Sequence, residues 1–460
     1  MKDKCANPQA PNGAEGSIAG QPTPPFSAAD EADTSARSTV SVSETTATSA
    51  PCALGHEEKN HNRLSSGRPA ADFDRTAPRG SHAPTVNKLT PPSQTSASPG
   101  YRQPRHGHSI HVHDHSNGTV YGALDLGTNN CRLLLARPSR RGFRVVDAFS
   151  RIIRLGEGVA NSGKLSEPAM SRTLDALKIC AAKLDRHRVT RARFVATEAC
   201  RIAQNGMEFI DRVRKLCGLE IEVLNPELEA RLAVSGCSSL IDCSVDYVLV
   251  FDIGGGSSEI IWLDLTREGA RRRGPGGRIA ADSSIAAWTS LPVGVVTLAE
   301  RFDGRNVTFD DFEAMVSAVS ELLAPFEAHH RFAERLEGRG VHFLGTSGTV
   351  TTIAGILLNL PRYDRNKVDG CWLAVPDIFS VTQNLLAKSY AERIAEPCIG
   401  RERADLVLAG CAILEAVLRM WPAQRLRVAD RGLREGILTT LMQEDGVWRQ
   451  GRRRRRQRSN

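Results

Sequence analysis

Two stretches of this chain share one arrangement, in which an apolar strand runs into Asp-x-Gly and then into a hydroxyl or amide side chain. The first covers residues 121–129 and contains Asp125, and the second covers residues 248–258 and contains Asp252. An apolar run that ends in aspartate places a carboxylate at the carboxyl edge of a buried sheet, and the glycines after it let backbone N–H groups close around an anion. A third loop, residues 343–349, alternates glycines with hydroxyls after a short apolar strand. Together the three loops predict a cleft that binds a phosphorylated ligand.

Phosphate contacts are expected from all three loops. The second loop is the strongest indication, because its three consecutive glycines carry no side chain that would obstruct an anion and Ser257 adds a hydroxyl where the next element begins. The candidate phosphate-binding residues are Asp125, Gly127, Thr128, Asn129, Gly254, Gly255, Gly256, Ser257, Gly345, Thr346, Ser347 and Gly348.

The two aspartates at matching positions suggest a metal site. Asp125 and Asp252 end their strands at one cleft in this interpretation, so they could share a divalent cation that also contacts phosphate oxygens. Magnesium suits such an oxygen-only site, whereas the alternative for either aspartate is a turn or capping role. Glu259 could point toward the same cation or lie on the strand surface, and the residues alone leave both interpretations open.

Hydrolysis of a phosphoanhydride also needs a group that orients water, and a carboxylate near the hinge between two lobes would serve. The helix that begins at Asn225-Pro226 carries Glu227 and Glu229 in its first turns. Taken alone, these glutamates are more typical of favourable charges at a helix N-terminus. Arg201 follows a strand end and could either clamp phosphate with two hydrogen bonds or lie exposed.

The elements that must position these residues form two similar halves. In each half, an opening set of strands is followed by alternating helices and strands, which implies an α/β sandwich. The shared opening implies an internal duplication with an interdomain cleft, and we expect a first lobe at residues 119–240 and a second at 241–445. Helices are expected after Ser166, after Asn225-Pro226, and at about 309–326, 348–358, 376–388 and 403–420.

The two ends of the chain differ from this pattern. Residues 1–118 are rich in Ser, Thr, Ala, Pro and Gly, have few large apolar residues, and are expected to form a disordered extension. Residues 446–460 are expected to form a basic disordered tail, which is either solvated or a hook for a polyanion such as polyphosphate or RNA.

Cysteine usage and the absence of long apolar segments indicate where in the cell this protein is expected. The 460 residues carry a formal net charge of +8 and 11 cysteines, an odd number without a C-x-x-C pair, which favours reduced thiols. The first thirty residues lack an apolar signal segment, and no apolar run is long enough to span a bilayer. We therefore expect a soluble, cytoplasmic protein without a membrane partner and without specific nucleic-acid binding.

Seven blocks of the chain, in order and in register across roughly residues 121–440, resemble the exopolyphosphatase and guanosine pentaphosphate phosphohydrolase (Ppx/GppA) family. The blocks are residues 123–129, 155–158, 196–201, 229–232, 252–257, 345–349 and 430–436. The resemblance implies a two-lobed, actin-like α/β fold of the acetate and sugar kinase superfamily. It also implies magnesium-dependent removal of terminal phosphate from inorganic polyphosphate or, as the alternative, from guanosine pentaphosphate. Family analogy further suggests a homodimer.

The resemblance assigns roles to particular side chains. It implies that Glu229 orients or deprotonates the attacking water, that Arg201 contacts phosphate, and that Asp252 and Glu259 are the carboxylates on the metal side. We expect this chain to depart from the family in three places. Residues 128–130 read Thr-Asn-Asn where serine-asparagine-serine is more usual, and residues 225–228 read Asn-Pro-Glu-Leu where Gly-x-Glu more often leads into the Glu-Ala-Arg block. We also expect no helical phosphohydrolase-type domain, of the kind found in longer members, after residue 445.

Two other classes share this kind of fold. A kinase or actin-like ATPase usually carries larger insertions between its phosphate loops and lacks the Glu-Ala-Arg block at residues 229–231. A non-catalytic sensor of polyphosphate or of the guanosine nucleotide would be expected to lack the water-orienting carboxylate, yet Glu229 is present. The sequence therefore favours a hydrolase.

Overall fold

The computed structural model describes residues 118–140, 142–271 and 281–448. The extension expected to be disordered, apart from residue 118, and residues 449–460 of the expected basic tail lie outside the described residues. Residues 446–448 are described, and the indole of Trp448 donates to the backbone carbonyl of Ser139 at 2.9 Å.

The first sheet contains five strands in the order β3-β2-β1-β4-β5. Its three opening strands form an antiparallel meander, and its last two run parallel to β1. The strands are β1 (Tyr121–Leu126), β2 (Asn130–Ser139), β3 (Gly142–Ile152), β4 (Arg191–Ala196) and β5 (Ile221–Val223).

The second sheet repeats this order and adds one edge strand. Its order is β10-β11-β9-β6-β7-β8, so an antiparallel meander is again followed by two parallel strands. The strands are β6 (Tyr247–Ile253), β7 (Ser258–Asp264), β8 (Ile285–Leu291), β9 (Val341–Ser347), β10 (Trp372–Ala374) and β11 (Arg425–Ala429). The matching strand orders confirm the internal duplication and the two-lobed, actin-like α/β fold.

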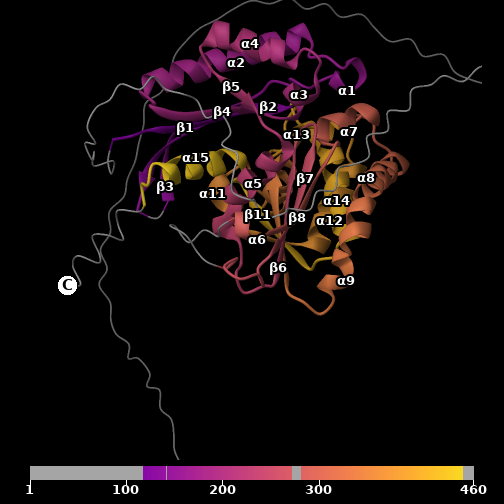
Figure 1. Cartoon of the computed structure of the whole chain (residues 1–460). Helices are drawn as coiled ribbons and strands as arrows, with labels where there is room; N and C mark the ends of the chain where they lie inside the picture. The colour runs from indigo at the N-terminus through magenta and orange to yellow at the C-terminus, as the bar shows by residue number, and fades with distance from the viewer. Residues whose placement is uncertain (1–117, 141, 272–280, 449–460) are drawn as a thin grey trace, which may run out of the picture. The chain divides into compact units, whose positions relative to one another are not determined.

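Helices cover both faces of each sheet (Figure 1). Those that follow the first-lobe strands are α1 (Val159–Ser162), α2 (Glu167–Arg186), α3 (Glu198–Ile202) and α4 (Gly206–Cys217). The others are α5 (Pro226–Cys237), a 3-10 turn (Ser238–Leu240), α6 (Ala281–Ser284), α7 (Val295–Arg301), α8 (Phe309–His330), α9 (Phe332–Leu336), α10 (Gly348–Leu357), α11 (Arg365–Val368), α12 (Val375–Ala387), α13 (Tyr390–Ala395), α14 (Val407–Met420) and α15 (Leu433–Glu444).

Local signals explain several helix starts. The side chain of Ser166 accepts a hydrogen bond from the backbone of Ala169 at the start of α2, and Asn225 does the same for Leu228 at the start of α5. The helix expected at 403–420 begins later, at Val407. Residues 401–406 instead form turns that contribute to the cleft and to the contact between the lobes.

Two helices connect the lobes. Ala230 and Val234 of α5 pack with Val248 and Val250 of the second sheet, although α5 falls in the range expected for the first lobe. By contrast, α15 packs on the first sheet, although its residues fall in the range expected for the second lobe. The two helices also pack against each other at glycines. A Cβ atom at Gly236 would lie 1.9 Å from the carbonyl oxygen of Gly432, and one at Gly436 would lie 2.0 Å from that of Leu232.

Strand periodicity then places the two aspartates. Alternate residues of a strand face the same side of its sheet. Tyr121 and Ala123 pack in the cluster that contains α15, and Asp125 is the next residue of that row. Val248 and Val250 pack in the cluster that contains α5, and Asp252 continues their row. Both carboxylates therefore lie on the sheet faces that the two connecting helices cover.

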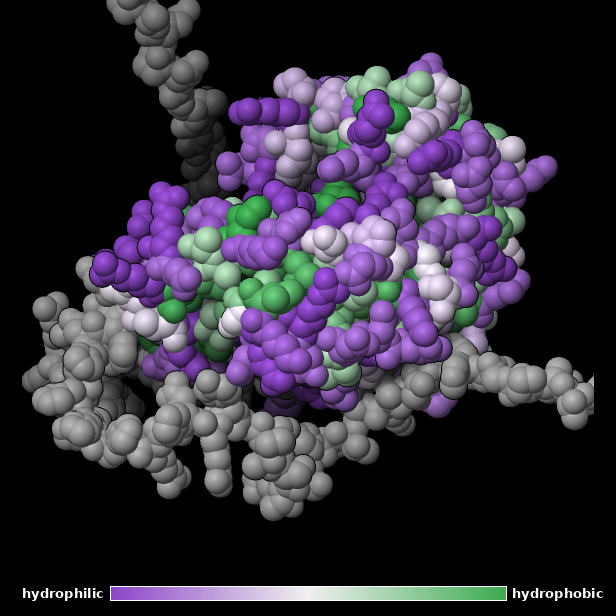
Figure 2. Space-filling model, turned by 90° about the horizontal axis from the view of Figure 1, so that it is seen from above, coloured by the Kyte–Doolittle hydropathy of each residue, from purple (hydrophilic) through white to green (hydrophobic). Residues whose placement is uncertain are grey.

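On the face drawn in Figure 2, hydrophilic residues predominate and hydrophobic residues form separate groups among them. Among the described residues, no helix combines the length and the apolar character that crossing a membrane requires.

The helix contact predicts a steric effect. Gly236→Ala should lower the free energy of unfolding by about 1–3 kcal/mol, because the added methyl group would force the backbones of α5 and α15 apart. Chemical unfolding monitored by circular dichroism measures the change. Gly340→Ala is the control, since its Cβ would have its nearest neighbour at 3.6 Å, an ordinary contact. Equal stability of the two variants would contradict this account.

Candidate active site

A cavity of about 150 Å³ lies between the lobes and gathers most of the predicted residues. Its lining includes Asp125, Gly127, Thr128, Asn129, Glu229, Asp252, Gly254, Gly255, Gly256, Ser257, Glu259, Ser347 and Gly348. Of the other predicted residues, Thr346 lines an adjoining cavity, whereas Gly345 and Arg201 line neither of these two cavities.

The two Asp-x-Gly loops fold into the same turn. The N–H of Gly127 donates to the carbonyl oxygen of Asn130 at 2.9 Å, and the N–H of Gly254 donates to that of Ser257 at 2.9 Å. Within the described part of the chain, the N–H groups of Gly255 and Gly256 donate to no backbone or side-chain acceptor. They are therefore free to bind an anion in the cavity that both residues line.

The same glycines let the lobes approach closely. Thr128 of the first loop lies against the second loop, so a Cβ atom at Gly255 would be 2.9 Å from the Cβ of Thr128. A Cβ atom at Gly256 would be 2.9 Å from the hydroxyl oxygen of Thr128. A larger residue at either position would push the two phosphate loops apart. The absence of side chains at these glycines therefore lets the two loops pack closely and leaves their N–H groups accessible.

The third loop contributes a helix N-terminus rather than a full set of phosphate contacts. Ser347 caps α10 by accepting from the N–H of Val350 at 3.3 Å, and Gly348 begins the helix at the cavity. Gly345 lies inside β9, where a Cβ atom would be 2.8 Å from the Phe251 ring, so its size is explained by packing. The side chain of Thr346 hydrogen-bonds to Asp252.

Strand register explains the carboxylates on the second lobe. Thr346, Asp252, Glu259 and Ser290 are direct neighbours across β9, β6, β7 and β8. One oxygen of Glu259, Oε1, accepts from the hydroxyls of Ser257 and Ser290, each at 2.9 Å. Directly opposed side chains of neighbouring strands lie close together, so the two carboxylates repel each other.

Burial and repulsion change the acidity of this pair. Burial raises the pKa of Asp252 to about 6, against the opposing effect of the Thr346 hydrogen bond. Burial, followed by the charge of Asp252, raises the pKa of Glu259 to about 7. Burial also raises the pKa of Asp125, although the guanidinium of Arg132, its neighbour in β2, lowers it. Three carboxylates with raised pKa values, of which Glu259 is buried and the two aspartates are partly buried, form a site that a cation would stabilise.

The donor set fits magnesium if the substrate supplies further ligands. Among the described residues, no group of three or more His, Cys, Asp or Glu side chains is arranged to hold a metal ion alone. Mg²⁺ in phosphate-handling proteins is typically bound by one or two carboxylates together with phosphate oxygens and water. The side chain of Asn129 supports this fit, because its Oδ1 atom is buried without a hydrogen-bond partner.

Glu229 belongs to a second ionic group, on the side of the cavity formed by α3 and α5. Its Oε2 accepts from Nη1 of Arg201 at 3.1 Å, and the same arginine contacts Glu198. Burial, then the charge of Glu259, raises the pKa of Glu229 well above its ordinary value, and Arg201 opposes that effect. Glu227 is separate from this group, because it pairs with Arg231 on the same helix at 3.0 Å.

A larger cavity of about 690 Å³ adjoins the first and shares Asp125, Asp252, Ser347 and Gly348 with it. Its arginines are Arg132, Arg151, Arg365, Arg401, Arg403, Arg431 and Arg434. Arg365 and Arg431 are engaged by Glu435 and Asp369. By contrast, within the described residues Arg132, Arg403 and Arg434 form no ion pair, although the charges of Arg132 and Arg434 lower the pKa of Asp125.

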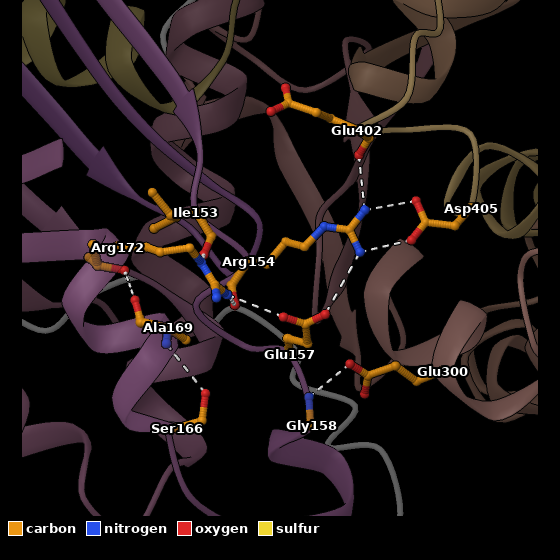
Figure 3. A network of polar contacts seen from close by, with 11 residues as sticks. Ile153, Arg154, Glu157, Gly158, Ser166, Ala169, Arg172, Glu300, Glu402 and Asp405 are labelled. Atoms are coloured by element: carbon orange, nitrogen blue, oxygen red, sulfur yellow. Dashed lines mark hydrogen bonds and ion pairs between the residues drawn. The ribbon is translucent and has the colours of Figure 1, made fainter. Parts of the chain in front are cut away.

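A group of polar contacts, the clasp, joins the lobes beside the cavities (Figure 3). Arg154 pairs with both oxygens of Asp405, each at 2.8 Å, and the N–H of Gly158 donates to Glu300 at 2.8 Å. The clasp is attached to the first phosphate loop, because the N–H groups of Ile153 and Arg154 donate to the carbonyl of Asn129.

Sequence reasoning did not assign roles to Glu198, Arg132, Arg403 or Arg434. The first two had usable signals. Glu198 lies three residues before Arg201, a spacing that places both on one face of a helix. Arg132 lies opposite Asp125 if the loop at residues 127–130 is a hairpin turn. Arg434 belongs to the block at residues 430–436 that resembles the family, whereas Arg403 reaches the cavity through tertiary structure, for which the sequence holds no local signal.

The raised pKa of Glu259 predicts a pH effect on the metal-free protein. Its ordinary value is 4.5 and its folded value is about 7, so its contribution to stability is complete below about pH 4.5 and is lost as pH rises through about 7. Glu259→Gln should therefore gain stability relative to wild type between pH 5 and pH 8, as urea unfolding in EDTA would measure.

The matched control is Glu313→Gln, because Arg419 holds the pKa of Glu313 below its ordinary 4.5. Its stability relative to wild type should not change between pH 5 and pH 8. If the difference between Glu259→Gln and wild type is also constant over this range, Glu259 does not titrate there.

Comparison with known proteins agrees with this geometry. Residues 135–445 match the model of the Ppx/GppA phosphatase family. A crystal structure of the Aquifex aeolicus family member is 28% identical, with a TM-score of 0.57, and the match covers 71% of this chain and 98% of that one. An exopolyphosphatase from Cytophaga hutchinsonii is 27% identical, with a TM-score of 0.62, over 71% of this chain and 98% of that one. Because the family match spans both lobes and every residue of the second phosphate loop, this chain belongs to the Ppx/GppA phosphatase family.

Proposed function

We propose that this protein is an exopolyphosphatase, which hydrolyses the terminal phosphoanhydride bond of inorganic polyphosphate. The observation that carries the proposal is the arginine-lined cavity beside the phosphate loops. Hydrolysis of a terminal phosphate requires a small site for that phosphate and a continuous path for the rest of a polyanion. The two adjoining cavities, of about 150 and about 690 Å³, supply both.

In this mechanism the free N–H groups of Gly255 and Gly256 bind the terminal phosphate, together with the N-terminus of α10 at Gly348. Asp125 and Asp252 would hold Mg²⁺, which would supply charge stabilisation to the phosphate oxygens. Arg132, Arg403 and Arg434 bind phosphates farther along the chain. Charge complementarity of this kind would also steer the substrate into the cleft.

Glu229 is the proposed general base. A base acts best when its pKa is close to the working pH, and burial moves the pKa of Glu229 upward in that direction. Deprotonated Glu229 accepts a proton from water as the water attacks the terminal phosphorus. The bridging oxygen leaves with the shortened chain, and the departing phosphate carries the added oxygen.

Guanosine pentaphosphate is the second candidate substrate, and one feature of the larger cavity favours it. Tyr363 lines that cavity, and its hydroxyl donates to Asp430 at 2.6 Å. The ring of Tyr363 could stack on a guanine base while the carboxylate of Asp430 accepts hydrogen bonds from the N–H groups of that base. The polyphosphate proposal has the stronger support, because among the described residues that line this cavity three arginines without an ion pair could bind a polyanion, whereas only one aromatic ring could bind a base.

The test is phosphate release from long-chain polyphosphate and from guanosine pentaphosphate in parallel, each with and without Mg²⁺, with ATP as the control substrate. Faster magnesium-dependent release from polyphosphate is expected. A preference for guanosine pentaphosphate would establish the second candidate instead. Release from ATP alone would overturn both assignments and indicate an actin-like ATPase.

Glu229→Gln should reduce the turnover number by at least about 10²-fold while polyphosphate binding is retained, because the amide keeps the shape of the side chain but accepts a proton poorly. Steady-state phosphate release and a filter-binding assay would measure the two effects. Glu227→Gln is the matched control, on the same helix but paired with Arg231, and it should keep near-normal turnover. Near-normal turnover of Glu229→Gln would assign the base to another carboxylate.

A further inference from the structure

The guanidinium of Arg201 is held by protein groups on every side. Its Nε and Nη2 atoms both donate to Oε2 of Glu198, at 2.9 and 2.5 Å. Its Nη1 donates to the carbonyl of Leu224 at 2.6 Å and to Glu229 at 3.1 Å. All three nitrogens are therefore engaged, and the side chain lines neither of the two cavities described above. This arrangement leaves little capacity for a two-point phosphate clamp.

Glu198 is placed to impose this arrangement. It is the first residue of α3, two residues after the end of β4, and the spacing of three residues puts it on the same helical face as Arg201. Unlike Arg201, it lines the smaller cavity, where a Cβ atom at Gly256 would be 3.0 Å from its Cγ. The second phosphate loop therefore packs against the stem of Glu198.

The position of Arg201 near the phosphate loops explains why a carboxylate partner would affect its orientation. A buried guanidinium beside a phosphate site would tend to turn toward the phosphate, because charge-assisted bonds to phosphate are strong. Glu198 and Arg201 are only 13% and 17% exposed, so solvent screens their attraction weakly. Their pairing competes with phosphate for the guanidinium, and it leaves Nη1 directed at Glu229.

We propose that Glu198 is a positioning residue for hydrolysis, which fixes Arg201 so that Arg201 in turn fixes the carboxylate of Glu229 toward the attacking water. The proposal rests on the proposed function, in which Glu229 is the base. It assigns to Arg201 a role in holding the base rather than in clamping phosphate. Loss of Glu198 should then affect the chemical step more than substrate binding.

The first test is a double-variant cycle on phosphate release with Glu198→Gln, Arg201→Ala and both changes together. Glu198→Gln should lower kcat on the order of 10-fold to 10²-fold, the cost of a misplaced reacting group, with KM changed less than about threefold. The double variant should lose no more than Arg201→Ala alone, because Glu198 acts through Arg201. Fully additive losses would overturn the proposal. So would a lower KM with unchanged kcat in Glu198→Gln, the result expected if Arg201 were a phosphate clamp.

The control is Glu222→Gln, which removes a glutamate from another two-bond arginine pair in the same lobe, with Arg193 at 3.1 Å for each bond. It should leave kcat and KM unchanged. A loss in this variant equal to that of Glu198→Gln would mean that any ion pair of the lobe supports activity, and the specific role of Glu198 would be refuted.

The second test needs no substrate and separates this proposal from the proposed function. Glu198→Gln should lower the melting temperature by several degrees in the wild-type background, and by much less in the Arg201→Ala background. Equal shifts in both backgrounds would show that Glu198 does not hold Arg201 and would overturn the proposal. If the proteins melt as expected but release phosphate from neither substrate, the proposed function fails while the contact between Glu198 and Arg201 stands.

Discussion

The close approach of two helix backbones determines the geometry of the cleft. At Gly236 and Gly436, α5 and α15 meet with no room for a Cβ atom. Since α5 packs on the second sheet and α15 on the first, this contact sets the separation of the sheets. It thereby sets the separation of the two aspartates, each of which ends the strand row that its helix covers. The first turn of α5 also carries Glu229, so the proposed base is positioned by the same contact.

The cleft concentrates negative charge, and the structure limits the cost in two ways. Hydroxyls of Ser257 and Ser290 bond to Glu259, and Thr346 bonds to Asp252, so these buried oxygens are not left without partners. Burial, and for Glu259 also the charge of Asp252, still raises the pKa of both carboxylates, against the opposing charges of Arg132 and Arg201. Under the proposed function, a cation that arrived with the phosphate would relieve the repulsion between these carboxylates.

The parts of the site that depend on local pattern could be predicted from the sequence. Apolar strands that end in aspartate, consecutive glycines and the Asn-Pro helix start are local signals, and the structure places Asp125, Asp252 and Gly255 in one cavity. The sequence could not show whether a glycine leaves room for an anion or, like Gly345, for the ring of Phe251, because the neighbours of each glycine depend on tertiary structure. Nor could it reveal the pairing of Arg154 with Asp405, which are 251 positions apart.

The clasp and the helix crossing together restrict how the lobes can move. Two bodies that are held at a single point can turn relative to each other about three axes, whereas a second fixed point leaves only rotation about the line that joins the two. The crossing of α5 and α15 is one such point, and the two-bond pair of Arg154 with Asp405 is the other. The bond from Gly158 to Glu300 is a further contact, so together these contacts oppose relative movement of the lobes. Wide opening of the cleft, in which the two phosphate loops separate, would require the contacts of the clasp to break first.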